Sequence, residues 1–371
     1  MPGGTAAAPR TLDDLLEPCF EADDPFAWWD DGRDAWWTSL AQAGVPATLA
    51  TSPLLRVASS ARPGPGRVSG PAAPYRHMLV PSAVFKRGLD VSTARDVVGC
   101  SSSGTRGSLS SVPRDDDTLQ RFFSGVRASI RSLFDLGTSG FTLINLVPSI
   151  SMPRAPWTSY IVAGMAAAHP TIEPGSRAAA DVLAEAAALN ERCLLIGAPH
   201  DVLSFAQAAG GSRRWDGRLV VLTVGGWKRH QGEALAPVEL RERVSGLLGT
   251  DHRDIRDGYG MVELNSVLIE CSAHRKHVPP WLEVAVLCPR RFEPVAEGTE
   301  GMLAFFDPTA TSFPGFVLSE DVGVRHDTPC PCGVAGPTLT GVRRLVTVEA
   351  RGCALTSMPQ RAPRLAELQP V

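Results

Sequence analysis

Between Asp115 and Tyr259 the sequence alternates between segments with apolar residues at helical spacing and short, nearly continuous apolar runs. The runs FTLINLV, CLLIG and RLVVLTV have the length of buried strands and are closely followed by Gly or Pro. The predicted helices cover residues 115–136, 177–192, 201–209 and 237–248, and the predicted strands cover 141–147, 193–197, 218–224 and a run that ends near 259. Such alternation predicts an α/β fold with a largely parallel sheet.

The two ends of the chain differ from this region. Residues 1–97 are rich in Trp, Pro and Ala, and we expect an N-terminal tail, peripheral helices and a long exposed connection over 52–74. From Trp281 onward, LEVAVLCP, GMLAFFDP and GFVLSEDVGVRH predict strands separated by turns. The predicted division is a peripheral segment of residues 1–97, a core of 98–340 that ends in a small β-rich subdomain, and a C-terminal tail of 341–371. A chain of 371 residues allows two lobes or two domains.

Charge and composition narrow the class of protein. A net charge of -3 gives no electrostatic reason to expect nucleic acid or an anionic membrane as a partner. No apolar run reaches the ~18–20 residues of a membrane span, and MPGGTAAAPRT lacks the order of a secretion signal. We therefore expect a cytoplasmic protein. Its eight cysteines then indicate free thiols, metal ligands or a catalytic thiol rather than a disulfide framework.

Three glycine-containing segments lie where α/β sheets bind ligands, beside the ends of predicted strands. They are CSSSGTRGS (residues 100–108), GGWK (225–228) and DGYGMVE (257–263). Each alone also fits a connector, a turn or a bulge. Together with SEDVG at 319–323, their order resembles the succession of motifs in adenylate-forming enzymes. The GGWK form, the chain length and the late RGCAL segment are most similar to the acyl-protein synthetase family of bacterial bioluminescence, the synthetase component of fatty-acid reductase, and next to the phenylacetate-CoA ligase branch.

The resemblance covers roughly residues 98 to 354 and implies the large N-terminal domain of an adenylate-forming enzyme. Such an enzyme activates a small carboxylic acid with ATP and Mg2+ as an acyl-adenylate and passes the acyl group to a thiol. The thiol belongs to the enzyme itself or to a carrier or reductase partner. Two alternatives remain open: a ligase that uses free CoA, and a non-catalytic paralogue that binds a nucleotide.

The resemblance also implies the nucleotide ligands, position by position. A flexible glycine-rich loop brings backbone N–H groups and hydroxyls onto phosphates, and the matching loop residues are Ser102, Ser103, Gly104, Thr105 and Gly107. Tyr259 would lie against the adenine, Glu263 would hold Mg2+ and Asp321 would accept the ribose hydroxyls. The remaining expected nucleotide contacts are Gly225, Gly226, Gly260, Met261 and a hinge arginine, Arg343, with Arg344 as the other register.

Some positions depart from the family pattern. Arg106 replaces a small hydroxyl residue and the usual later lysine of the loop is missing, so Arg106 or Arg114 would have to supply that charge. Val262 replaces a common threonine. Lys228, one of only three lysines, is a candidate for contact with carboxylate or phosphate, with a solvated lysine as the alternative.

The segment after the expected hinge is short. Thirty residues follow Gly341 and none is lysine, so we expect a truncated lid without the catalytic lysine of larger relatives. Cys353, in EARGCALTS, is the candidate acyl-accepting thiol by resemblance, and neighbouring arginines would lower its pKa. The alternative is a strand cysteine that faces the core.

A second set of residues predicts a metal centre. CSAHRKH places a thiol and two imidazoles within seven residues, and CPCG adds two thiols about sixty residues later. Soft S and N ligands favour tetrahedral zinc. The resemblance to the phenylacetate-CoA ligase branch selects Cys271, His277, Cys330 and Cys332 as ligands of a structural Zn2+. The alternative is a group of buried free cysteines beside a His-rich surface loop.

Overall fold

The computed structural model describes residues 11–31, 33–42, 79–86, 92, 94–102, 109–134, 140–152, 155–189, 191–211 and 214–345. The predicted connection over 52–74 and the tail beyond residue 345, with Cys353, lie outside the described residues.

Parallel strands form one half of the central sheet, as the alternating sequence predicts. They are β4 (Thr142–Asn145), β5 (Thr171–Ile172), β6 (Cys193–Gly197), β7 (Leu219–Val224) and β8 (Ile255–Tyr259). Each pairs in parallel with its neighbour in the order β5-β4-β6-β7-β8. Every residue of β6 and β7 is buried, because helices cover both faces.

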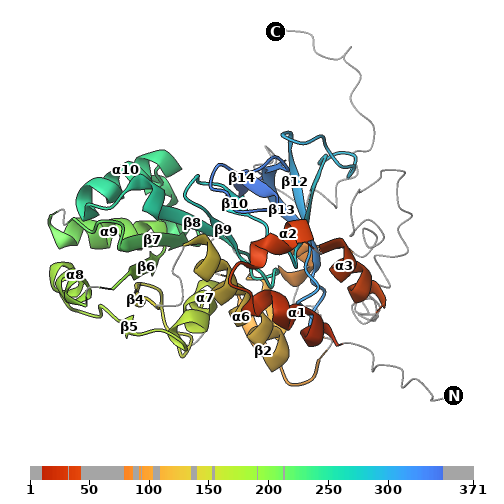
Figure 1. The fold of residues 1–371 in the computed structure, drawn as a ribbon, viewed down its shortest axis with the longest axis horizontal. Coiled ribbons are helices and arrows are strands. Elements are labelled where there is room, and N and C mark those ends of the chain that lie inside the picture. The colour runs from red at the N-terminus through yellow and green to blue at the C-terminus, as the bar shows by residue number, and fades with distance from the viewer. Residues whose placement is uncertain are drawn as a thin grey trace, which may run out of the picture.

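The helices lie on both sides of these strands. On one face are α6 (Asp116–Leu133) and α7 (Trp157–Ala166); on the other are α8 (Ala179–Ala188), α9 (Pro199–Ala209) and α10 (Pro237–Leu248). Alternate residues of β6 follow this division. Leu194 and Ile196 pack with the first group of helices, whereas Cys193 and Leu195 pack with the second. Figure 1 shows α8, α9 and α10 gathered at one end of the molecule with these strands.

Local signals explain where several helices begin and end. Asp115 caps α6, since its carboxylate accepts a hydrogen bond from the Thr118 N–H. A proline occupies the first turn of both α9 and α10, and Gly210 and Gly249 end them in the left-handed conformation. In contrast, α7 is a helix that we did not predict. Seven of its ten residues are buried, so it has no polar face to reveal a helical period.

Antiparallel strands continue the same sheet. They are β9 (Leu268–Glu270), β10 (Lys276–His277), β11 (Glu283–Leu287), β12 (Glu300–Phe306), β13 (Phe316–His326) and β14 (Thr338–Arg344). The order is β11-β12-β13-β14-β10-β9-β8, with β1 (Val80–Pro81) parallel to β13. The β-rich C-terminal part is therefore joined to the parallel half by continuous strand pairing. A separate pair, β2 (Val98–Ser101) and β3 (Ser111–Arg114), flanks the predicted phosphate loop.

The N-terminal segment is helical, as predicted, in α1 (Leu12–Glu21), η1 (Pro25–Ala27), α2 (Trp28–Asp31) and α3 (Arg33–Gln42). These helices pack against the main core through buried side chains such as Leu16 and Phe26. Arg33 is also buried, lies over the Trp29 ring and forms an ion pair with Glu283 at the start of β11. The segment thus packs against the antiparallel half of the sheet, and Figure 1 shows α2 and α3 beside that half.

The described helices include none that is both long and apolar enough to cross a membrane.

Candidate functional site

Two of the predicted nucleotide ligands meet at the end of β8. The hydroxyl of Tyr259 donates a hydrogen bond of 2.7 Å to Oδ2 of Asp321 on β13. The ring of Tyr259 stacks on Phe305, with centroids 5.9 Å apart. Burial, followed by the negative charge of Asp321, raises the pKa of Tyr259 well above its ordinary value, so the phenol stays protonated and remains a donor. The pair joins the parallel and antiparallel halves of the sheet.

A second contact brings Glu263 to the base of the predicted phosphate loop. Ser110 donates a hydrogen bond of 2.5 Å to Oε1 of Glu263, and both side chains are buried. Ser110 also forms two bonds with Ser102, at the other end of the loop. The Ser102 N–H donates to the Ser110 carbonyl, and the Ser110 N–H donates to the Ser102 hydroxyl, each at 3.0 Å. We call Ser102, Ser110 and Glu263 the serine clasp.

Burial raises the pKa of Glu263 above its ordinary value. The hydrogen bond from Ser110 and the positive charges of Lys86 and Arg344 act in the opposite direction. Lys86, at the end of η3 (Ser82–Lys86), also pairs with Glu320 at 2.8 Å. Lys86 lies in none of the motifs that predict the site. Its rarity was a usable signal, since the chain has only three lysines.

Arg114 holds the segment around Glu263 instead of facing a ligand. Its guanidinium is fully buried and donates to the carbonyls of Val262 (2.7 Å) and Leu264 (3.1 Å) and to the Asn265 side chain (3.0 Å). It also lies 3.7 Å from the centroid of the Trp157 ring. Burial lowers its pKa to about 10, which leaves it charged at neutral pH. The idea that Arg114 replaces the missing lysine of the loop is therefore corrected, because its guanidinium is buried and bonded to two carbonyls and the Asn265 side chain.

The hinge arginines point to different partners. The strand register places Arg344 opposite Asp321 and Arg343 opposite Val322. Arg344 lies 3.5 Å from Asp321 and also pairs with Glu320, whereas Arg343 is more than half exposed and forms a two-pronged pair with Glu300 at 2.9 Å. Adjacent residues of a strand face opposite sides, so only one arginine can face Asp321. The structure places Arg344 beside Asp321, whereas Arg343 forms an exposed ion pair with Glu300.

For the other predicted contacts, the structure describes mainly the position of the backbone. Gly225 follows β7 with φ of 73°, a left-handed conformation that favours glycine, and Gly226 is exposed beside it. Lys228 begins the 3-10 helix η4 (Lys228–Glu233), and its side chain lies outside the described residues. Gly260 and Met261 follow Tyr259, whose hydroxyl lies 3.6 Å from the Met261 sulphur. Ser103, Gly104, Thr105, Arg106 and Gly107 lie outside the described residues.

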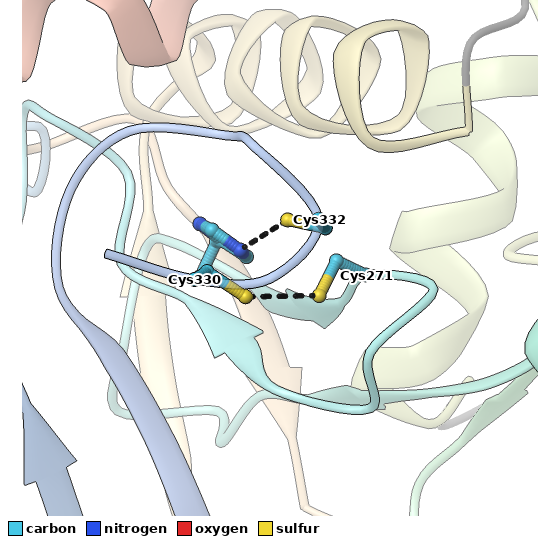
Figure 2. Close-up of side chains that lie close together, drawn as sticks. Cys271, Cys330 and Cys332 are labelled. Atoms are coloured by element: carbon cyan, nitrogen blue, oxygen red, sulfur yellow. Dashed lines mark hydrogen bonds between the residues drawn. The ribbon is translucent and has the colours of Figure 1, made fainter. Parts of the chain in front are cut away.

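The four predicted metal ligands lie close together: one directly follows β9, one lies in β10 and two lie in the segment before β14. The ligand atoms of Cys271, His277, Cys330 and Cys332 all lie within 4.8 Å of one another. The sulphurs of Cys271 and Cys330 are 3.6 Å apart, and the Cys332 sulphur is 3.3 Å from Nε2 of His277 (Figure 2). His274 is not part of this group, because its ring faces Glu270 instead.

The spacing of this group fits a tetrahedral ion. Zinc–sulphur bonds of about 2.3 Å at tetrahedral angles place two sulphurs about 3.8 Å apart. Backbone N–H groups of Ala273 and Val334 each point at a ligand sulphur from 3.4 Å, which favours thiolates. All seven cysteines that the structure describes are free, so no disulfide competes for these thiols.

A network of buried charges joins the metal group to β8. Lys276, next to His277, lies 2.8 Å from Asp257 and 3.0 Å from Glu270, and Arg241 reaches Glu270 at 2.9 Å. Burial alone would raise the pKa of Glu270, but the neighbouring His274 ring and the charges of Lys276 and Arg241 lower it to about 2. Asp257 stands two residues before Tyr259, so this network fixes the strand that carries the tyrosine. The spacing of these residues in the sequence does not predict the network.

Similarity to known proteins indicates the family of the chain. The family model described as acyl-protein synthetase, LuxE, matches residues 77–362. The long-chain-fatty-acid--luciferin-component ligase of Aliivibrio fischeri is 30% identical over 290 residues, which cover 75% of this chain and 77% of that protein. The protein of the same name from Vibrio harveyi is 28% identical over 294 residues, or 75% and 76% of the two chains.

Solved structures share the fold. An open conformation of 2-hydroxyisobutyryl-CoA ligase in complex with 2-HIB-AMP and CoA has a TM-score of 0.59 at 13% identity, over 82% of this chain and 68% of that chain. The same ligase in its postadenylation state has a TM-score of 0.56 at 13% identity, over 80% and 66%. The predicted α/β fold of an adenylate-forming enzyme is confirmed.

Proposed function

The chain belongs to the acyl-protein synthetase family LuxE, and from that membership we propose that it uses ATP to convert a carboxylic acid to an acyl-adenylate and then transfers the acyl group to a thiol. The observation that carries the site assignment is the contact between Tyr259 and Asp321. It joins two motifs, through residues 62 positions apart in sequence, at the carboxyl end of a parallel strand, where sheets of this class bind ligands.

The residues of the site have separate roles in this proposal. The Tyr259 ring lies against the adenine and the Asp321 carboxylate accepts the ribose hydroxyls. The loop that starts at Ser102 contacts the phosphates. Glu263 is the one carboxylate of the serine clasp, and hard oxygen ligands are those that Mg2+ prefers. Lys86 and Arg344 add positive charge beside Glu263, and Lys228 remains a candidate contact for carboxylate or phosphate.

The chemistry has two displacement steps. A carboxylate oxygen of the acid attacks the α-phosphorus of ATP, the bond to the bridging oxygen breaks, and pyrophosphate leaves. A thiolate then attacks the acyl carbonyl, the bond to the phosphate oxygen breaks, and AMP leaves. Bound Mg2+ would neutralise phosphate charge. The protein contributes mainly by positioning the reactants and by directing donors and cations at the phosphates.

The acyl acceptor is to be distinguished among three thiols: that of Cys353, that of a carrier or reductase protein, and that of free CoA. The two similar proteins named above carry the term long-chain fatty acid in their names, so fatty acids belong in the substrate panel beside short and aromatic acids. We favour a protein thiol, because the description of the family, acyl-protein synthetase, names a protein as the acceptor of the acyl group.

The cysteine group is proposed to hold a structural Zn2+. Three thiols and one imidazole within 4.8 Å supply the ligand number and type of a closed zinc site. An ion there would fix the turn of Cys330 and Cys332 against β9 and β10. Through Lys276 and Asp257 it would also support the strand that ends at Tyr259.

The test is release of pyrophosphate from ATP by purified protein against a panel of carboxylic acids, first without a thiol and then with CoA. We expect acid-dependent release, and hydroxylamine-labile acyl protein without added CoA. Absence of acid-dependent release across the panel, despite binding of ATP, would support a non-catalytic paralogue. Turnover that requires free CoA would instead identify a CoA ligase.

A further inference from the structure

A second cluster of possible metal ligands lies away from the cysteines, beyond the carboxyl ends of β6 and β7. His200 lies in the first turn of α9, shortly after β6, and His230 and Glu233 lie in η4, shortly after β7. The two strands are neighbouring and parallel, with Gly197 opposite Thr223. Segments that follow them therefore emerge side by side, although the histidines are thirty residues apart in sequence.

The three side chains converge. The imidazole rings of His200 and His230 are nearly parallel, at 13°, with centroids 3.6 Å apart. Nε2 of His200 lies 3.8 Å from one oxygen of Glu233, and Nδ1 of His230 lies 3.5 Å from the other. One ligand atom from each residue lies within 4.8 Å of the other two. Both rings thus turn a nitrogen toward the same carboxylate.

An adjacent carboxylate orients one of the rings. Nδ1 of His200 lies 3.4 Å from Oδ1 of Asp201. A hydrogen on Nδ1 leaves the lone pair on Nε2, the nitrogen that faces Glu233. Histidines that bind metals commonly donate their second ring N–H to a carboxylate in this way. In this arrangement Asp201 would orient the His200 ring, and His200 and Glu233 would be two ligands of the same ion.

We propose that His200, His230 and Glu233 bind a divalent transition-metal ion, with Zn2+ as the natural occupant by ligand type. Two imidazoles, which are borderline ligands, and one carboxylate, which is a hard ligand, form a set that binds zinc and its neighbours, and three protein ligands leave a position for water. The side chains are partly exposed, which gives an ion access. The ion would fasten η4 to α9. Because η4 begins at Lys228, it would order the segment that directly follows Gly225 and Gly226.

The test separates this site from the thiolate group by its spectrum. Metal-depleted full-length protein is titrated with Co2+. Cobalt at the thiolates gives intense sulphur-to-metal absorption in the near ultraviolet, whereas cobalt held by imidazole and carboxylate gives only weak visible bands. We expect a further equivalent of Co2+ to bind without charge-transfer absorption. His230→Ala and Glu233→Gln should lose that equivalent and keep the thiolate signal. Asp201→Asn should bind it about tenfold more weakly.

A matched control is His252→Ala, which removes an exposed histidine from η5 (His252–Asp254). It should keep both signals. Hydrogen exchange gives a second readout, since the added ion should slow exchange across residues 228–233 in wild type and not in His230→Ala. The proposal is overturned if all bound cobalt shows thiolate absorption, or if His230→Ala and Glu233→Gln bind the additional equivalent as wild type does.

Discussion

Ser110 donates a 2.5 Å hydrogen bond to Glu263 and at the same time pairs through its backbone with Ser102. The carboxylate proposed to hold Mg2+ is thus tied to the base of the loop proposed to hold the phosphates. A change in the position of the loop would be transmitted to the carboxylate through one buried hydroxyl. Ser110 is therefore a positioning residue, and its effect should appear in how activity depends on pH.

Ser110→Ala should move the acidic limb of the pH profile of pyrophosphate release to higher pH. The hydrogen bond from Ser110 stabilises the ionised carboxylate and lowers the pKa of Glu263, so its loss raises that pKa. A protonated Glu263 cannot serve as an anionic ligand. A hydrogen bond to a charged group contributes about 1.5 kcal/mol or more, so the acidic limb should move by about one pH unit.

Ser110→Thr is the control, because it keeps the hydroxyl and should keep the wild-type profile. If Ser110→Ala lowers activity equally at every pH, the serine supports the fold of the loop but does not tune the carboxylate.

Glu263→Gln should abolish pyrophosphate release while leaving the protein as stable as wild type, or more stable, at neutral pH. Burial raises the pKa of Glu263 in the folded state. Such a group contributes stability below its ordinary pKa, and that contribution is lost as pH rises through the folded pKa. A glutamine does not titrate, so Tm of the variant relative to wild type should increase from acidic to neutral pH.

Calorimetry at both pH values measures this difference, with Glu300→Gln as an exposed control. A lower Tm of Glu263→Gln at neutral pH would show that the charge itself holds the site together.

Much of the parallel half was predictable because its signals are local. The buried runs of β6 and β7 are continuous and short, and Pro237 and Gly249 mark the ends of α10. The mostly buried α7 has no such period, and the packing of the N-terminal helices on β11 depends on contacts such as that of Arg33 with Glu283, far apart in sequence.

Candidate site residues could be selected from the sequence where a motif contained them, but not where a contact partner came from elsewhere in the chain. Tyr259, Glu263 and Asp321 lie in recognisable motifs. Ser110 looks like any serine of a Ser-rich loop, and its role depends on a residue 153 positions away. The choice between Arg343 and Arg344 depends on the register of β14 with β13, which sequence alone does not fix.

The register of β14 predicts unequal effects of its two arginines. Arg344→Ala should raise KM for ATP severalfold, because it removes a positive charge beside Asp321 and Glu263. Arg343→Ala removes an exposed pair with Glu300, and such pairs contribute about 1 kcal/mol or less. It should leave both KM and Tm close to wild type. Steady-state kinetics of both variants decide the assignment, and a larger KM effect in Arg343→Ala would reverse it.

Cys330→Ser should lower both zinc content and Tm. Purified wild-type protein should contain near-stoichiometric zinc at the cysteine group, and loss of one thiolate leaves an incomplete site. Cys288→Ser is the matched control, since Cys288 is a free cysteine outside the group and should leave zinc content unchanged. Elemental analysis and thermal unfolding measure the two effects. Wild-type protein that lacks zinc at the thiolates without ever meeting a chelator would rule out the structural ion.

Cys353 should carry the acyl group if the acceptor belongs to the chain itself. The residue lies in the C-terminal segment after β14, outside the described residues, and its assignment comes from the resemblance to acyl-protein synthetases. A thioester requires a thiolate, and Arg351, two residues earlier in sequence, would favour that form. β14 ends at Arg344, which lies beside Asp321, so the segment leaves the sheet next to the proposed nucleotide site. Cys353 lies only nine positions after Arg344, and an extended chain of that length spans up to about 30 Å.

The measurement is mass spectrometry of intact protein after incubation with ATP, Mg2+ and an acid that supports pyrophosphate release. Wild type should gain one acyl group that hydroxylamine removes, and Cys353→Ser should form the adenylate without the adduct. Cys288→Ser controls for general loss of a thiol and should acylate normally. An adduct that persists in Cys353→Ser would place the acceptor on another cysteine. Adenylate that accumulates in wild type with no adduct would favour an external thiol and leave Cys353 as a packing residue.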